Sequence, residues 1–176
     1  NNTMKLKTIK DIPEIKGKKI LLRVDFNVPL DKDLNITDDT RITEALPTIK
    51  ELNGKGAKLI IMSHLGRPKG EIVEKLRLTP IAKHLEKLLG KTVLKIDDIN
   101  SDKIKKMNDG EIIMLENIRF HKEEKECEEN FCKELASLGE IYVNDAFGTA
   151  HRKHASTAGL AEHLPAYAGL LMEKEI

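Results

Sequence analysis

Short runs of consecutive aliphatic residues, separated by polar stretches, dominate the hydrophobic pattern of this chain. Each run has the length of a strand, and most are too continuous for a strand with one face in water. Such runs indicate strands that are buried on both faces of a parallel sheet. The predicted strands cover residues 19–24, 57–62, 91–96, 111–115 and 140–143.

Helical spacing of apolar residues separates several of these runs. The first predicted helix begins with Asp39 or Thr40 as its cap and ends at Gly54. The second has Thr79 as its cap, Pro80 at the favoured first position and a closing Gly90. A third is expected over 123–138, with acidic residues in its first turn.

The alternation of strands and helices predicts the fold class. A strand, a crossover helix and a parallel strand connect with right-handed geometry, which places helices on both faces of the sheet. We therefore expect a three-layer, doubly wound, Rossmann-like α/β fold with a mostly parallel sheet and a single domain. Two segments depart from the pattern: 28–36 is too short for a crossover and predicts a small hairpin, and 164–169 breaks the chain before a helical run over 170–176.

Composition and charge narrow the function classes. The 176 residues suit one domain, and 40% hydrophobic content is enough for one core. Thirty basic against 29 acidic residues leave a net charge of +1, which disfavours nucleic acid or a membrane as a partner. No apolar run is long enough to span a bilayer and no secretory signal is visible, so we expect a soluble, cytoplasmic protein. Residues 1–4 read as cloning residues and the start of the protein.

Polar residues of unusual chemistry follow the predicted strands. Because the carboxyl ends of parallel strands meet at one edge, these residues should converge there. Guanidinium groups offer paired donors to phosphate or carboxylate oxygens, and a carboxylate with an amide beside them suits a hydroxyl group. The implied ligand is small, strongly anionic and hydroxylated. The converging residues are Asp25, Asn27, Arg41, His64, Arg67, Arg119, His151 and Arg152.

A less specific interpretation of the same arginines stays open. Any one of them could be solvated or paired with the many acidic residues, since surface ion pairs are common and weak. Gly66, Gly70 and Gly148 allow the backbone to approach an anion closely, but they also suit ordinary turns.

Several other motifs are incomplete. The segment from Asp31 opens like a calcium-binding loop but has Ile36 where glycine is required, so a hairpin turn is expected. Residues 66–70 lack the ending of a phosphate-binding P-loop, and no GxGxxG occurs. His154 and Ser156 lack the companions of a metal site or hydrolase relay. Cys127 and Cys132 are expected to be free thiols, and 122–129 a solvated helix start.

The residues at these strand ends resemble phosphoglycerate kinase. The segments that carry the resemblance are RVDFNVP at 23–29, Arg41 with ALPTI at 45–49, SHLGRP at 63–68, LENIRF at 115–120 and NDAFGTAHR at 144–152. Several independent motifs in the family's usual order make the match specific, and it extends from about Lys5 to the end of the chain.

The resemblance implies an organisation in two domains. The N-terminal domain of the family binds 3-phosphoglycerate or 1,3-bisphosphoglycerate, and the C-terminal domain binds magnesium-ADP or magnesium-ATP. Residues 5–169 match the first domain and 170–176 the start of the hinge helix, whereas the nucleotide domain is absent. The enzyme is expected to be a monomeric glycolytic kinase, and the chain by itself to bind no nucleotide or metal and to lack turnover.

The resemblance also implies roles for individual residues. Arg41 is expected to be catalytic, stabilising charge on the transferred phosphoryl group. The residues expected to bind the substrate are Asp25, Phe26, Asn27, Arg41, His64, Leu65, Gly66, Arg67, Arg119 and Arg152. The main alternative is a non-catalytic anion-binding module of the same fold. A dinucleotide-dependent oxidoreductase is disfavoured because the glycine fingerprint is missing.

Overall fold

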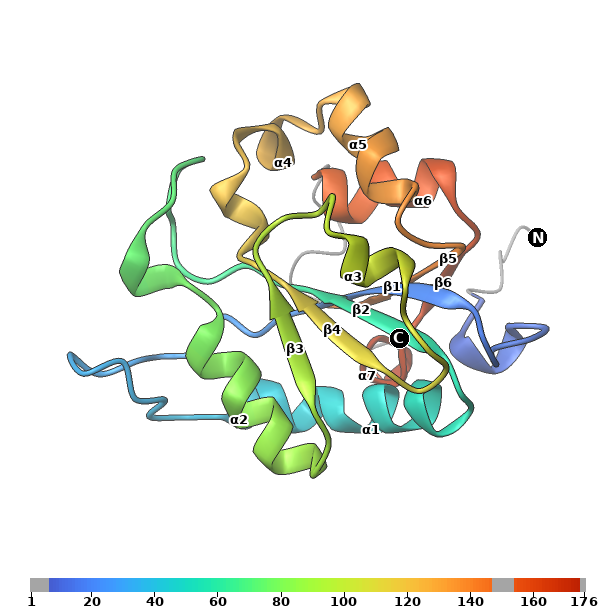
Figure 1. Cartoon of the computed structure of the whole chain (residues 1–176), viewed down its shortest axis with the longest axis horizontal. Coiled ribbons are helices and arrows are strands. Elements are labelled where there is room, and N and C mark those ends of the chain that lie inside the picture. Colours follow the sequence, from blue (N-terminus) through green and yellow to red (C-terminus); the bar gives the residue numbers. More distant parts are fainter. Residues whose placement is uncertain (1–6, 147–153, 175–176) are drawn as a thin grey trace.

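A parallel sheet forms the centre of the computed structural model (Figure 1). The structure describes residues 7–146 and 154–174, within which the sheet has six strands in the order β3-β4-β2-β1-β5-β6. Every neighbouring pair is parallel, as expected for the doubly wound α/β class. The strands are β1 Lys19–Val24, β2 Lys58–Met62, β3 Val93–Ile96, β4 Ile112–Leu115, β5 Ile141–Asp145 and β6 Ala166–Ala168.

Helices cover both faces of the sheet and complete three layers (Figure 1). One face carries α1 Thr40–Gly54, α2 Thr79–Leu89 and α7 Leu170–Lys174, and the other carries α3 Asp102–Lys105, α4 Lys122–Glu126, α5 Glu129–Ala136 and α6 Leu160–His163. Single turns of 3₁₀ helix lie at Ile9–Asp11, Glu74–Leu76 and Ile118–Phe120, and a π-helical turn at Ala155–Gly159.

Alternating side chains of the strands divide the interior into two cores. On β1, Ile20 and Leu22 pack into the core beneath α1, whereas Leu21 packs into the core beneath α5. Both cores are aliphatic and their strand residues are almost completely buried. Because successive side chains enter opposite cores, β2 and β4 appear in the sequence as continuous apolar runs, and β1 as a run that only Arg23 interrupts.

The strand order favours a ligand site at the carboxyl ends of the strands on either side of β1. The chain moves from β1 to β2 on one side and later returns to pair β5 with the other side of β1. Ligands of open α/β sheets bind outside the carboxyl ends of the strands at such a reversal. The loops that follow β1, β2 and β4 all lie at this edge.

The end of the chain corrects one sequence prediction. Residues 164–169 were expected to interrupt regular structure, but Ala166–Ala168 form β6, which pairs with β5 at the sheet edge. Three small residues at an edge produce no apolar run, so the pattern missed them. The other edge is also less buried than predicted, because Leu94 of β3 is 37% exposed.

The predicted helix over 123–138 is two helices. Cys127 ends α4 in a left-handed conformation with φ of 50°, and the Glu128 side chain caps α5 by accepting hydrogen bonds from Asn130 N and Phe131 N. The interpretation of 122–129 as solvated is wrong for Glu124, which is completely buried.

The bounds of the other predicted elements differ from the structure by at most two residues. Helix α2 begins at Thr79 instead of being capped by it, and it ends at Gly90 in a left-handed conformation, as expected. The hairpin over 28–36 is confirmed by an antiparallel bridge between Leu30 and Ile36. Among the described residues, no helix is long and apolar enough to cross a membrane.

Candidate functional site

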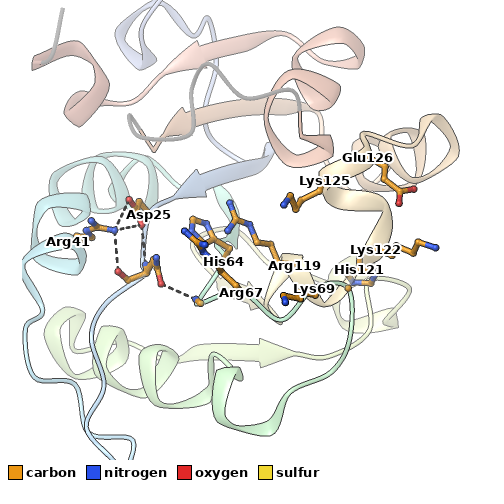
Figure 2. A pocket seen from close by; sticks show the side chains of 13 residues that line it. Asp25, Arg41, His64, Arg67, Lys69, Arg119, His121, Lys122, Lys125 and Glu126 are labelled. Carbon is orange, nitrogen blue, oxygen red and sulfur yellow. Dashed lines mark hydrogen bonds and ion pairs between the residues drawn. The ribbon is translucent and has the colours of Figure 1, made fainter.

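A pocket of about 1030 Å³ opens at the carboxyl edge of the sheet (Figure 2). Its walls come from the loops after β1 and β2, the start of α1, the turn after β4 and the start of α4. The lining is mainly cationic, which is the charge distribution expected for an anion site. The lining residues are Asp25, Asn27, Arg41, His64, Gly66, Arg67, Lys69, Gly70, Arg119, His121, Lys122, Lys125 and Glu126.

Most of the residues predicted to form the site meet in this pocket. Asp25, Asn27, Arg41, His64, Gly66, Arg67 and Arg119 all line it. Phe26 and Leu65 do not, because their side chains are buried in the core. Their backbone groups bond within the protein, since Phe26 N donates to Ser63 Oγ and Leu65 O accepts from Asn117 Nδ2. Arg152 and His151 lie outside the described residues.

An ion pair sets the position of Arg41. Its Nη1 lies 3.1 Å from both carboxylate oxygens of Asp25 and 3.2 Å from the carbonyl oxygen of Asn27. Asp25 Oδ1 also accepts a hydrogen bond from Asn27 N at 3.1 Å. Helix α1 thus delivers Arg41 to the loop after β1, and the remaining guanidinium donors can serve an anion.

Hydrogen bonds join the loops that follow β1 and β2. Gly66 N donates to Asn27 Oδ1 at 2.9 Å, and Phe26 N donates to Ser63 Oγ at 2.9 Å. Gly66 has φ of 63°, and a Cβ there would lie 2.8 Å from Leu76 Cδ2. Glycine is therefore favoured by the left-handed backbone conformation, and a larger residue would also have to displace the Leu76 side chain. Because the side-chain oxygen of Asn27 accepts the hydrogen bond from Gly66 N, the side-chain NH2 group of Asn27 is the part available for a ligand.

The turn after β4 is held by buried polar contacts. Asn117 Nδ2 donates to Leu65 O and Leu76 O, while its Oδ1 accepts from Arg119 N at 3.0 Å. The neighbouring Glu116 faces away from the pocket toward Arg77 and Lys95. These contacts fix the backbone from which the Arg119 side chain enters the pocket.

The electrostatics of Glu116 show how firmly this turn is anchored. Burial by itself raises the pKa of Glu116, but hydrogen bonds from Lys95, Leu78 N, Asn117 N and Arg77 outweigh it and hold the pKa below its ordinary value. The carboxylate is therefore charged at neutral pH and stabilises the turn that carries Arg119.

Sequence reasoning missed the far end of the pocket. Lys69, Lys122 and Lys125 extend the cationic surface beyond the arginines, and His121 and Glu126 line the pocket beside them (Figure 2). Gly70 allows the close approach of the two segments, since a Cβ at this position would lie 2.9 Å from Lys122 Cα. The run from Lys122 was interpreted as a solvated helix start, and no local pattern indicates that it faces Lys69. The available signal was its position directly after the LENIRF motif.

Comparisons with known proteins identify the family. A family model described as phosphoglycerate kinase matches residues 9–176. The chain belongs to the phosphoglycerate kinase family. Curated relatives named phosphoglycerate kinase are 58% identical over 98% of this chain in Dictyoglomus turgidum and 52% identical over 98% in Pelotomaculum thermopropionicum.

Solved phosphoglycerate kinases share the fold. The structure from Coxiella burnetii superimposes with a TM-score of 0.89 at 38% identity, and the one from Pyrococcus horikoshii with 0.87 at 39%, each over 97% of this chain. The chain spans 45% and 44% of the two curated relatives and 43% and 44% of the two solved chains. The resemblance inferred from the strand-end motifs is thereby confirmed as family membership in phosphoglycerate kinase.

Proposed function

We propose that this chain is the phosphoglycerate-binding half of a phosphoglycerate kinase. In this proposal the cationic pocket holds 3-phosphoglycerate or 1,3-bisphosphoglycerate for phosphoryl transfer to and from a magnesium nucleotide. The carrying observation is the convergence of Arg41, Arg67 and Arg119 with Asp25 and Asn27 at one sheet edge. Arg152 is proposed as a further contact from the motif alone.

The donor set fits the substrate class. Guanidinium groups bind the phosphate and carboxylate through paired N–H donors. The Asp25 carboxylate and the Asn27 amide supply an acceptor and a donor for the hydroxyl group of the substrate. Guanidiniums are not ligands of Mg²⁺, and Asp25 is already paired with Arg41, so this pocket fits the anionic substrate instead of the metal.

Phosphoryl transfer depends mainly on positioning and on stabilising charge. Arg41 is proposed to place its unpaired guanidinium donors beside the transferred group, while Arg67 and Arg119 hold the rest of the substrate. The magnesium nucleotide is a co-substrate, and we place it on a second domain joined through α7. Closure about that hinge would exclude water from the reacting groups.

The remaining features of the proposal follow from the family. We propose a cytoplasmic, monomeric, glycolytic, ATP-binding enzyme in which residues 5–169 form the N-terminal domain and 170–176 begin the hinge helix. By itself the 176-residue chain should bind the substrate without turnover, because its sequence has neither a P-loop nor a GxGxxG motif. ATP formation by this chain from 1,3-bisphosphoglycerate and ADP would contradict this expectation.

The binding test is a titration followed by two-dimensional NMR. The chain is titrated with 3-phosphoglycerate and, separately, with inorganic phosphate, each at low and moderate salt because screening weakens such contacts. We expect saturable shifts at residues 25–27, 64–67 and 119, larger for 3-phosphoglycerate than for phosphate. Arg67→Ala should weaken the 3-phosphoglycerate affinity roughly ten-fold or more.

A charge-matched control separates the site from the overall field. Lys103→Ala removes an exposed cation on α3 that does not line the pocket, and it should leave the affinity unchanged. If 3-phosphoglycerate shifts the spectrum no more than phosphate does, or if both variants weaken binding equally, the alternative of an unselective anion-binding module is favoured.

A further inference from the structure

Arg23 is the largest fully buried side chain among the described residues. It is the fifth residue of β1, between Met62 of β2 and Asn144 of β5 in the register of the sheet. Moving a guanidinium out of water is costly unless it is hydrogen-bonded and its charge is compensated. The contacts of Arg23 therefore indicate what the side chain does.

Two hydrogen bonds define the position of the Arg23 guanidinium. Nη1 donates to the Val24 carbonyl at 2.7 Å, and Nη2 lies 2.9 Å from Nδ1 of His64. Arginine has donors only, so the lone pair of His64 Nδ1 must accept this hydrogen bond. In the neutral imidazole the ring proton then resides on Nε2.

The positive charge of Arg23 is partly offset by the carboxyl group of Glu124 on the neighbouring helix α4. Glu124 of α4 is completely buried and accepts hydrogen bonds from Ser156 N, at 2.8 Å, and from Ser156 Oγ. Burial raises the pKa of Glu124 overall, and the nearby charges of Arg23 and Arg119 limit that rise. The attraction of Glu124 lowers the cost of burying the Arg23 guanidinium, whereas the hydrogen bonds to Val24 O and His64 Nδ1 fix its position.

We propose that Arg23 is a positioning residue that holds His64 as the Nε2–H tautomer, so that His64 offers the substrate an uncharged hydrogen-bond donor. His64 lines the pocket beside Arg67 and Arg119 (Figure 2). These arginines already supply positive charge, and a neutral N–H adds direction without repelling them. The identity of the substrate rests on the proposed function, but the tautomer does not.

The first experiment reads the tautomer without any ligand. In the wild-type chain labelled with ¹⁵N at its histidine rings and arginine side chains, we expect Nδ1 of His64 to have the chemical shift of an unprotonated ring nitrogen. We also expect a scalar coupling across the hydrogen bond to Nη2 of Arg23. A proton on Nδ1, or signals averaged between two tautomers, would overturn the proposal.

Two variants separate positioning from a general structural role. Arg23→Met removes the donor, and the His64 ring signals should move toward the average of two exchanging tautomers. The dissociation constant for 3-phosphoglycerate should rise roughly ten-fold, as for the loss of one well-placed hydrogen bond. Glu124→Gln removes the compensating charge but keeps the Arg23–His64 bond, so it should lower the thermal stability and leave the ring signals in place.

The outcomes distinguish this inference from the proposed function. Equal changes of the His64 signals in both variants, with native amide spectra, would assign Arg23 a purely structural role and overturn the inference. If Arg23→Met does not fold, the coupling in the wild-type chain decides. A fixed tautomer without saturable binding of 3-phosphoglycerate would contradict the proposed function while leaving the tautomer assignment intact.

Discussion

Arg41 Nη1 is 3.1 Å from each carboxylate oxygen of Asp25, so one guanidinium nitrogen joins the start of α1 to the loop after β1. The Arg41 side chain is 53% exposed and that of Asp25 is 23% exposed. An ion pair with this exposure adds little to stability, on the order of 0.5 kcal/mol. Its importance therefore lies in orienting Arg41 toward the pocket.

Arg41→Ala should separate binding from stability. We expect the affinity for 3-phosphoglycerate to fall roughly ten-fold to a hundred-fold, because a charge-assisted contact and the orientation of Asp25 are lost together. The free energy of unfolding should change by less than about 1 kcal/mol. Calorimetric titration and urea unfolding of the same preparation test both statements, and a large loss of stability would mean that the pair is structural.

Asp145 makes the stability of the chain depend on pH. It is buried, and its Oδ1 accepts from Leu171 N at 2.9 Å and Met172 N at 3.3 Å at the start of α7. Burial raises its pKa from 3.8 to about 6, although these hydrogen bonds act in the opposite direction. Because the folded-state value is the higher one, its favourable contribution is complete below about pH 3.8 and is lost as the pH rises through 6.

Asp145→Asn should remove this dependence, since asparagine resembles the protonated acid. Relative to the variant, the wild-type chain should lose on the order of 2 kcal/mol of unfolding free energy between pH 4 and pH 7.5. Urea unfolding at several pH values measures the difference. Asp33→Asn, at the exposed hairpin tip, is the control and should follow the wild-type curve. Parallel curves for the wild type and Asp145→Asn would show that folding does not raise the pKa of Asp145.

Gly159 packs against the two thiols. A Cβ at this position would lie 2.5 Å from Cys132 Sγ and 3.1 Å from Cys127 Sγ. Gly159→Ala should therefore destabilise the chain by about 1–3 kcal/mol through overpacking. Cys132→Ala creates space for the added methyl group. The variant that combines Gly159→Ala with Cys132→Ala should therefore lose less unfolding free energy than the two single variants lose in sum. Gly54→Ala is the matched control: nothing lies within 4 Å of that Cβ, and stability should rise slightly.

The thiol of Cys132 should react slowly in the folded chain. It is 1% exposed, and burial raises its pKa to about 12, so the thiol stays protonated at neutral pH. A disulfide reagent should modify the partly exposed Cys127 first, and Cys132 only on the timescale of unfolding. Equally fast modification of both thiols in native buffer would contradict this order.

Glu116→Gln should loosen the turn that carries Arg119. The variant leaves the partly exposed cations Arg77 and Lys95 without their shared carboxylate, although Glu74 and Asp97 still pair with them, and this should cost about 1–3 kcal/mol of stability at neutral pH. Because the pKa of Glu116 is lowered in the fold, its contribution is present above its ordinary value of 4.5 and is lost as the pH falls below it. The deficit of the variant should therefore shrink in acid, as measured by thermal unfolding at pH 7 and pH 3.5.

Local patterns were sufficient for most of the fold because the relevant forces act locally. Strands buried on both faces are mostly apolar, so β1, β2 and β4 could be located from the sequence. The capping preferences of short polar residues and glycine located α1 and the end of α2 within a residue. Right-handed crossovers then restrict where the strand ends can meet, so the sequence pattern by itself predicts that Asp25, Arg67 and Arg119 lie together.

Tertiary packing decided the remaining features. The buried Glu124 is hydrogen-bonded to Ser156, 32 residues further along the chain, and no neighbouring residue signals this burial or the break at Cys127. Lys69 and Lys122 share a pocket only because Gly70 lets two loops approach. Arg23 looks like a polar interruption in an apolar strand, and its bond to His64 exists only across β1 and β2. The sequence alone determined the strands, the helices and the chemistry of the edge, because hydrophobic period and local hydrogen bonding act over a few residues. The three-dimensional fold alone decided which distant charges meet in the interior, because a buried charge is stable only beside a partner that the whole chain supplies.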